Sequence, residues 1–433
     1  MFNTISIFGL GYIGLPTATL FAARKKRVIG VDISQHVVDT INNGHIHIVE
    51  PDLDMLVSAA VTAGYLSATT VPLPAEAFLI AVPTPFKENH EPDLSFIEAA
   101  AKAIAPVLAK GNLVILESTS PVGTTDKLAD WLAAARPDLS FPQTAGESAD
   151  IQIAYCPERV LPGRVVHELV DNDRVIGGMT RTATYMAAAL YKTFVQGDLV
   201  ATNARTAEMC KLTENSFRDV NIAFANELSI ICAKLDINIW ELIALANRHP
   251  RVNILQPGAG VGGHCIAVDP WFIVHTAPEE AQMIRTARQV NDQKPQWVLE
   301  RTKSAVADVL ASKPDRTMAS VRVACLGLAF KPDIDDLRES PAVAITGMIA
   351  GLGCQVQVVE PHIDQLPKAL MKENVSLKTL PEALASADIV CVLVKHNAFI
   401  IENQSIKEHP CQIDVVGLDR RVVSITGQVR LFE

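Results

Sequence analysis

Cysteine is scarce in this chain of 433 residues, and its eight cysteines have no regular spacing. Disulfide-stabilised secreted domains carry dense, patterned cysteines, so the chain does not belong to that class. No two cysteines form a CxxC pair, a common start of a zinc site, and we expect no metal site. Four cysteines lie in or beside apolar segments and are predicted to be small buried side chains: Cys156, Cys325, Cys354 and Cys391.

Positive charge is also in short supply. The 38 Lys and Arg residues are outnumbered by 48 Asp and Glu residues, which gives a formal net charge of −10. Only one short basic run occurs, RKKR at residues 24–27. This balance argues against non-specific nucleic-acid binding, so an anionic ligand would need locally gathered Arg and Lys.

No apolar stretch is long enough to cross a membrane. The first twenty residues are apolar, but they lack the basic start and the small-residue cleavage site of a signal peptide. We therefore expect a cytoplasmic protein with reduced thiols and no membrane partner.

The pattern of apolar segments predicts an α/β protein. Apolar runs that are typical of strands buried on both faces alternate with helical segments over the first two hundred residues. The runs are 5–10, 28–33, 78–83, 113–118, 153–155 and 175–178. Six such strands separated by helices indicate a doubly wound, Rossmann-like domain with a parallel sheet.

The middle and the end of the chain predict two further domains. Residues 203–236 contain no Gly or Pro and suit one long helix, followed by helices at 239–246 and 281–311. Strand-like runs resume at 321–328, 355–359, 389–394 and 413–416. We expect a Rossmann-like domain (1–200), a central helical domain (201–312) and a second Rossmann-like domain (313–433).

A glycine fingerprint follows the first strand. Gly9, Gly11 and Gly14 stand between that strand and the next helix, as in a dinucleotide-binding turn. Asp32 ends the second strand, where a carboxylate binds the adenosine ribose and repels a 2′-phosphate, which favours NAD over NADP. The alternative is a glycine-rich turn without a ligand.

Three threonines follow the third and fourth strands. Thr84, Thr119 and Thr125 lie at strand ends, where ligands bind in open α/β sheets. Without the glycine fingerprint, ordinary turn and helix-cap chemistry would be the preferred explanation of these threonines.

The long helix carries a polar stripe. Lys211, Asn215 and Arg218 are spaced i, i+4, i+7 and share one face of the helix. Such a stripe is often only solvated, but it is also the set of donors that an oxyanion or a phosphate needs.

Two loops carry groups suited to catalysis. Cys265 follows Gly260, Gly262 and Gly263 in a loop that ends at Asp269. A thiolate in a glycine-rich loop near cations is a candidate nucleophile, although most lone cysteines are inert. Glu158 and Arg159 lie at a strand end, where Glu158 is a candidate base or a salt-bridged surface acid.

Together these groups suggest a four-electron oxidation. Hydride loss from an alcohol gives an aldehyde, and attack by the Cys265 thiolate gives a hemithioacetal. A second hydride loss gives a thioester, which water hydrolyses to a carboxylate.

These segments resemble the UDP-glucose/GDP-mannose dehydrogenase family over almost the whole chain. The matching motifs, in the family's order, are GLGYIGLP, VDIS, AVPTP, ESTSPVGTT, CPERVLPG, EMCKLTENSFRDVNIAFANE, GVGGHCIAVDP and GLAFKPDIDDLRESP. The loop GGHCIAVDPWF is similar to the branch that oxidises UDP-linked acetamido sugars, since Val268 stands where UDP-glucose members tend to carry Lys. The resemblance implies a role in making surface polysaccharide such as enterobacterial common antigen.

The resemblance also implies residue roles. Cys265 would form the thioester, Lys211 would exchange protons and stabilise oxyanions, and Glu158 and Asp269 would assist proton transfer and hydrolysis. Water or substrate would be placed by Thr119 and Asn215. NAD would be contacted by Gly9, Gly11, Tyr12, Ile13, Gly14, Asp32, Thr84, Thr125 and Arg338. The UDP-sugar would be contacted by Arg159, Val160, Lys211, Asn215, Arg218, His249, Arg251, Gly262, Phe330, Lys331 and Arg420.

The resemblance further implies a homodimer built on the long helix, with Arg251 reaching a neighbouring subunit. The C-terminal end departs from the family, and either Arg420 or Arg421 stands for its last substrate contact. Alternative interpretations are the same chemistry on UDP-N-acetylglucosamine, UDP-glucose or GDP-mannose, a non-catalytic nucleotide-sugar sensor, and a simple 3-hydroxyacid dehydrogenase.

Overall fold

The computed structural model describes residues 2–160, 163–263, 265–418, 421–423 and 429–431. Two compact units are present: Met1–Glu214 with His275–Pro278, and Asn215–Val274 with Glu279–Glu433. Each unit contains a Rossmann-like sheet, and long helices lie between the two sheets in the sequence, which confirms the predicted fold class. Arg420, a predicted substrate contact, lies outside the described residues.

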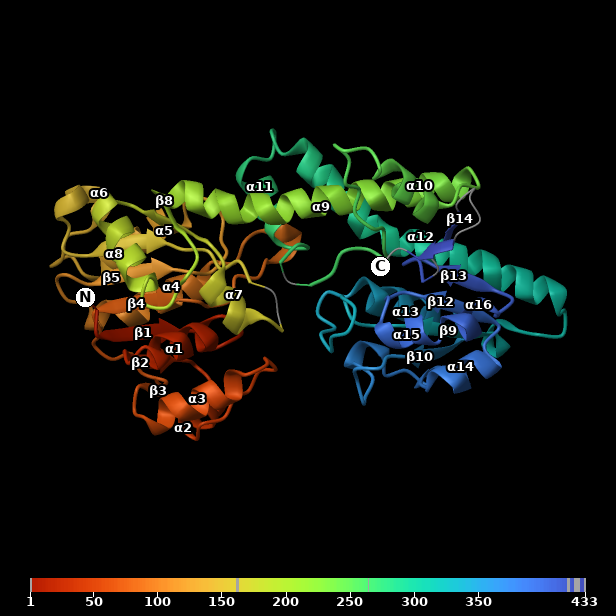
Figure 1. Cartoon of the computed structure of the whole chain (residues 1–433), viewed down its shortest axis with the longest axis horizontal. Helices are drawn as coiled ribbons and strands as arrows, with labels where there is room; N and C mark the ends of the chain where they lie inside the picture. The colour runs from red at the N-terminus through yellow and green to blue at the C-terminus, as the bar shows by residue number, and fades with distance from the viewer. Residues whose placement is uncertain (1, 161–162, 264, 419–420, 424–428, 432–433) are drawn as a thin grey trace. The chain divides into compact units, whose positions relative to one another are not determined.

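The N-terminal unit is built on an eight-stranded sheet (Figure 1, red to yellow-green). In spatial order its strands are β3 (Leu66–Thr69), β2 (Arg27–Val31), β1 (Thr4–Phe8), β4 (Ala77–Ile80), β5 (Leu113–Leu116), β6 (Gln152–Tyr155), β7 (Arg174–Gly178) and β8 (Leu199–Asn203). All six predicted strands are present, but β7 runs antiparallel to β6. An apolar run predicts that a strand is buried but does not give the direction in which the strand runs. The predicted parallel sheet was therefore wrong at β7.

Strand residues of the N-terminal unit alternate between two apolar cores. Ile5, Ile7 and Ile115 pack in one core, and Phe8, Phe78 and Leu116 pack in the other. The first core is covered by α1 (Gly14–Ala23), α3 (Leu53–Thr62), α7 (Val165–Asp171) and α8 (Arg181–Tyr191). The second core is covered by α4 (Ser95–Ile104) and α5 (Thr124–Ala135). Short helices α2 (Gln35–Asn42) and α6 (Pro142–Ala145) complete the unit.

Among the described residues, four α-helices lie between the two sheets in the sequence. They are α9 (Ala204–Lys234), α10 (Ile239–Ala246), α11 (Asp269–Thr276) and α12 (Gln282–Ser312). The sequence predicted α9, α10 and α12 within two residues of their observed ends, whereas α11 was not predicted. None of the described helices is both long enough and apolar enough to span a membrane.

The C-terminal unit holds a five-stranded parallel sheet (Figure 1, teal to blue). Its strand order is β11 (Val375–Leu377), β10 (Gln355–Val359), β9 (Arg322–Leu326), β12 (Ile389–Val392) and β13 (Gln412–Asp414). Its helices after β9 are α13 (Pro341–Gly351), α14 (Leu380–Ser386), α15 (Asn397–Ile401) and α16 (Asn403–Lys407). A small ribbon follows, made of β14 (Arg421–Val423) and β15 (Val429–Leu431).

The two sheets share one local plan at the end of their first strand. Gly9 follows β1 with φ +86° and Gly327 follows β9 with φ +92°. In each case the next residue donates its backbone N–H to an acid at the end of the neighbouring strand, Leu10 to Asp32 and Leu328 to Glu360. The turn after the first strand is therefore anchored in the same way in both units.

A buried polar network joins α9 and α12 within the C-terminal unit. Arg288 donates to Asp219 over 2.6 Å, and Asn226 donates to Asn291 over 2.9 Å. The side-chain oxygen of Asn226 also accepts the backbone N–H of Gly258 over 2.9 Å. Because these groups are buried and paired, they fix where the glycine-rich loop leaves the helices.

Candidate active site

The glycines of the first turn have distinct steric roles. A Cβ at Gly9 would lie 2.6 Å from the Ala81 carbonyl oxygen, and a Cβ at Gly14 would lie 1.8 Å from the Gly9 carbonyl oxygen. A Cβ at Gly11 would meet no atom within 4 Å. Gly9 and Gly14 thus permit the turn and the close helix, while Gly11 faces space that a pyrophosphate can enter.

Two neighbouring features suit a dinucleotide. Helix α1 begins without a side-chain cap, so the partial positive charge of its N-terminal N–H groups is available to a phosphate. Asp32 accepts the N–H groups of Leu10 and Ser34 through different carboxylate oxygens, over 3.0 and 2.9 Å. Each oxygen keeps lone pairs for ribose hydroxyls, so the residues present fit NAD.

The three threonines hold loops together at the strand ends. The Thr84 hydroxyl donates to the Thr119 carbonyl, which ties the loop after β4 to the loop after β5. The Thr125 hydroxyl donates to Glu208 over 2.6 Å, and the same carboxylate accepts the N–H groups of Gly123 and Thr125. The Thr84 and Thr125 hydroxyls are thus bonded within the protein. The contacts of Thr84 and Thr125 with NAD, and the role of Thr119 in placing water or substrate, remain predictions.

Glu208 is a site residue that the sequence reasoning missed. It lies on α9, is fully buried, and caps the N-terminus of α5 from 83 residues away. Burial raises the pKa of Glu208, while hydrogen bonds from Thr125 and Gly123 act in the opposite direction. Its spacing on α9, one turn before Lys211, is the one sequence signal that could have singled it out.

Glu158 and Lys211 form a largely buried charged pair in the N-terminal unit. The Lys211 ammonium lies 3.9 Å from a Glu158 carboxylate oxygen, and Lys211 is only 7% exposed. Glu158 also accepts the backbone N–H of Val160, which fixes the loop after β6. A largely buried Lys beside a carboxylate is a pair through which a proton can be exchanged.

Arg159 forms a second ion pair with a residue of α9. Its guanidinium lies 2.7 Å from Glu214 of α9, and it donates to the Asp173 carbonyl over 3.2 Å. Arg159 is exposed and Val160 is half-buried.

The Cys265 loop forms a compact turn in the C-terminal unit. The Cys265 carbonyl accepts the N–H groups of Val268 and Asp269 over 3.1 and 2.9 Å. Asp269 begins α11, is 3% exposed, and accepts from the Asn215 amide over 2.5 Å. The half-buried Cys265 thiol is therefore held one turn before a buried carboxylate and amide pair.

The same loop packs against the segment after β9. Cβ atoms at Gly262 and Gly263 would lie 2.8 and 2.9 Å from side-chain atoms of Phe330. The Gly263 N–H donates to the Arg338 carbonyl over 3.2 Å. Only glycine permits this approach, so the loop that carries Cys265 is in direct contact with the segment that carries Phe330 and Lys331.

The remaining predicted residues lie on the surface. Arg218, His249, Arg251 and Lys331 are exposed, and the Arg338 guanidinium pairs with Asp336. Arg218 thus differs from Lys211 and Asn215, which are buried on the same helix stripe. The predicted residues divide between the units: Lys211, Glu158, Thr119 and the glycine turn belong to one, and Cys265, Asn215, Asp269 and Phe330 belong to the other.

Three family models match successive parts of the chain. They describe the NAD binding domain (residues 3–195), the central domain (205–293) and the UDP binding domain (324–418) of UDP-glucose/GDP-mannose dehydrogenases. The chain belongs to the UDP-glucose/GDP-mannose dehydrogenase family. It is an NAD-dependent dehydrogenase, as the glycine turn and Asp32 predicted.

Several relatives from this dehydrogenase family match over nearly their full length. UDP-N-acetyl-D-mannosamine dehydrogenase of Yersinia pestis is 66% identical over 409 residues, which cover 94% of this chain and 97% of the relative. NDP-N-acetyl-D-galactosaminuronic acid dehydrogenase of Ralstonia nicotianae is 65% identical over 400 residues, 92% of each chain. The solved structure of UDP-D-ManNAc dehydrogenase from Pyrococcus horikoshii is 37% identical with a TM-score of 0.84, and the match covers 96% of each chain.

Proposed function

We propose that this enzyme oxidises the 6-hydroxymethyl group of UDP-N-acetyl-D-mannosamine to a carboxylate, with two NAD consumed per sugar. The observation that carries the proposal is the Cys265 turn, which places Cys265 one turn before Asp269, the buried partner of Asn215. Oxidation of an alcohol to an aldehyde uses no nucleophilic thiol, whereas a thiol can carry an aldehyde to an acid through a thioester. The Yersinia pestis relative supports the choice of sugar through its identity and coverage.

The chain's residues supply the proton and acyl chemistry. Bound NAD accepts a hydride in each of the two oxidations. Lys211 and Glu158, 3.9 Å apart, exchange the alcohol proton and stabilise oxyanion charge. Cys265 attacks the aldehyde carbon, the second oxidation leaves a thioester on its sulfur, and Asp269 with Asn215 orients the water that releases the uronate.

The second candidate substrate differs only in the sugar. The Ralstonia nicotianae relative is 65% identical and is described as an NDP-N-acetyl-D-galactosaminuronic acid dehydrogenase. The same thiol chemistry serves both sugars, so the choice depends on the pocket around the sugar hydroxyls and not on Cys265.

A substrate panel tests the sugar assignment. The purified enzyme is given NAD with the UDP derivatives of N-acetylmannosamine, N-acetylglucosamine, N-acetylgalactosamine and glucose, and NADH formation is followed. We expect the highest kcat/KM with UDP-N-acetyl-D-mannosamine. A clear preference for any other sugar contradicts the assignment and leaves the thiol chemistry intact.

We also propose that the enzyme is a cytoplasmic homodimer. Phe217, Phe224 and Met283 on α9 and α12 are 68%, 51% and 72% exposed, and Phe224 and Met283 line a shallow pocket between these helices. Such an apolar helix face is suited to a second copy of the chain. Light scattering should give a dimer, and Met283→Asp should shift it toward monomer. A wild-type monomer would contradict the proposal.

A further inference from the structure

The segment after β9 carries Phe330 and Lys331, the two predicted substrate contacts of the C-terminal sheet. In this bent segment, Asp333 and Glu339 have positive φ values of +59° and +48°. Residues with a side chain rarely adopt this left-handed backbone conformation. Such a conformation persists only where surrounding groups hold it. The holding groups lie on the two neighbouring strand ends.

Glu360, at the end of β10, is the first of these groups. It is 5% exposed and accepts the backbone N–H groups of Leu328, Ala329 and His362 over 2.7, 3.0 and 3.1 Å. Its fourth partner is the His396 ring, whose Nε2 lies 3.1 Å away. Burial acts to raise the pKa of Glu360, but these bonds and the His396 ring together lower it.

His396 joins Glu360 to the bent segment. The ring is fully buried after β12, and its Nδ1 accepts the backbone N–H of Asp333 over 2.9 Å. Because Nδ1 uses its lone pair in this bond, the ring proton must lie on Nε2, from which it donates to Glu360. In return, the Asp333 carboxylate accepts the N–H of Asn397, the first residue of α15, over 2.9 Å.

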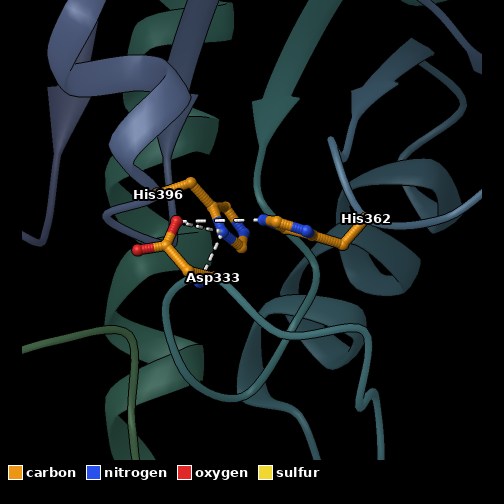
Figure 2. A group of neighbouring side chains, drawn as sticks. All are labelled: Asp333, His362 and His396. Atoms are coloured by element: carbon orange, nitrogen blue, oxygen red, sulfur yellow. Dashed lines mark hydrogen bonds and ion pairs between the residues drawn. The ribbon is translucent and has the colours of Figure 1, made fainter. Parts of the chain in front are cut away.

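Figure 2 shows how Asp333, His362 and His396 converge. Two histidines and an acid within reach of one another resemble a cation site. The bonds of His396 argue otherwise, since a metal would have to displace the Asp333 N–H from Nδ1. His362 is exposed, and its Nε2 lies 3.8 Å from the Asp333 carboxylate, too far for a hydrogen bond.

The bent segment also contacts the nucleophile loop. Phe330 fills the space beside Gly262 and Gly263, and the Arg338 carbonyl accepts the Gly263 N–H. A shift of the segment would therefore move Phe330, Lys331 and the backbone two residues before Cys265 together.

We propose that Glu360, His396 and Asp333 form a clasp that sets the position of Phe330 and Lys331, so that His396 is a positioning residue for nucleotide-sugar binding. The proposal rests on the function proposed above for the substrate, but UDP binding alone also reports on it. Neither His396 nor Glu360 contacts the substrate. They act through the backbone of the segment after β9.

The test compares four variants. His396→Ala removes both bonds of the ring. His396→Asn keeps an acceptor near the Nδ1 position for the Asp333 N–H, and His396→Gln keeps a donor near the Nε2 position for Glu360. His362→Ala is the matched control, because it removes a neighbouring histidine that is outside the clasp.

We expect His396→Ala to raise the KM for the UDP-sugar and the Kd for UDP about tenfold, since the part-buried Asp333 N–H loses its partner. NAD affinity, measured without sugar, should stay within about twofold because the glycine turn is untouched. Glu360 keeps its three backbone donors in every variant, whereas the Asp333 N–H depends on the side chain at position 396. His396→Asn, which keeps an acceptor for that N–H, should therefore restore UDP binding more than His396→Gln does. His362→Ala should match the wild type.

The outcomes separate the two proposals. A wild-type enzyme that binds UDP but oxidises no nucleotide sugar refutes the proposed function, and the UDP affinities still test the clasp. Wild-type UDP affinity in a folded His396→Ala or His396→Gln protein overturns the clasp. Equal losses in His362→Ala and His396→Ala overturn it as well, in favour of a cation site.

Discussion

At the residue scale, the proposed four-electron oxidation depends most on the Cys265 thiol. It is one of two half-buried cysteines in the C-terminal unit among the described residues, the other being Cys411. Cys265 lies in a turn closed by its own carbonyl, whereas burial raises the pKa of the Cys411 thiol. A raised pKa makes a thiol a poorer nucleophile, so the two cysteines provide a natural comparison.

We therefore expect Cys265→Ala to lower uronate formation by about 10³ or more, as loss of a nucleophile does in other enzymes. Cys411→Ser should retain the wild-type rate. Both are measured by chromatographic assay of the acid product with the UDP-sugar and NAD. Normal acid formation by Cys265→Ala would show that no thioester forms on this residue.

Residue roles could be predicted from sequence where they depend on local chain geometry. Gly9 and Gly14 follow from the strand, turn and helix around them, and both show the expected steric constraint. Glu208 and His396 were not predicted, because each acts on backbone groups more than sixty residues away. Only the folded chain brings such partners together.

At the element scale, the strand-to-helix turn after β1 makes a sharp prediction. Gly11→Ala should fold normally and weaken NAD binding about tenfold, because its Cβ enters the space proposed for the pyrophosphate. Gly14→Ala should instead destabilise the protein, since its Cβ would clash with the Gly9 carbonyl. Thermal unfolding and NAD titration distinguish the two, and equal melting temperatures would contradict the steric argument.

The α9 and α12 pair predicts a dependence of stability on pH. Lys294 is 1% exposed, bonds to Ser229, and lies over the Trp297 ring. Burial, with a smaller effect from the Arg301 charge, lowers the pKa of Lys294 to about 7. Between pH 7 and the unfolded pKa of about 10.4, the unfolded chain binds one more proton, so this group makes stability rise with pH.

Lys294→Met should remove that rise. The difference in free energy of unfolding between wild type and variant, from urea titrations at pH 7 to 10, should move in favour of the wild type as pH increases. Below pH 7 the difference should be constant, because Lys294 is then charged in both states. A difference that stays flat over the whole range would show that Lys294 titrates normally.

Strands whose residues are buried along their whole length could be predicted from the sequence, whereas strands with few buried residues were missed. The central strands and α9 follow from apolar runs and from the absence of Gly and Pro. The edge strands β3 and β8 were missed, since β8 has no buried residue and β3 alternates over only four. Edge strands keep one side unpaired and are stabilised by a single neighbour, so their sequence signal is weak.

At the scale of the whole molecule, the same turn and strand-end carboxylate occur in both sheets, but the two carboxylates accept different sets of hydrogen bonds. Both sheets place a glycine turn after the first strand and a carboxylate at the next strand end. Asp32 accepts two N–H groups and keeps lone pairs for a ribose, whereas Glu360 is filled by four internal donors. This difference agrees with the family models, which describe an NAD binding domain around the first sheet and a UDP binding domain around the second.

The amount of NADH formed per UDP-N-acetyl-D-mannosamine consumed distinguishes a four-electron oxidation from a two-electron one. NADH absorbance and the sugar product are followed in the same reaction until the sugar is exhausted. The thioester mechanism predicts two NADH per sugar and a uronate as the only sugar product. One NADH per sugar with free aldehyde would contradict the thioester mechanism and leave Cys265 without the role assigned to it.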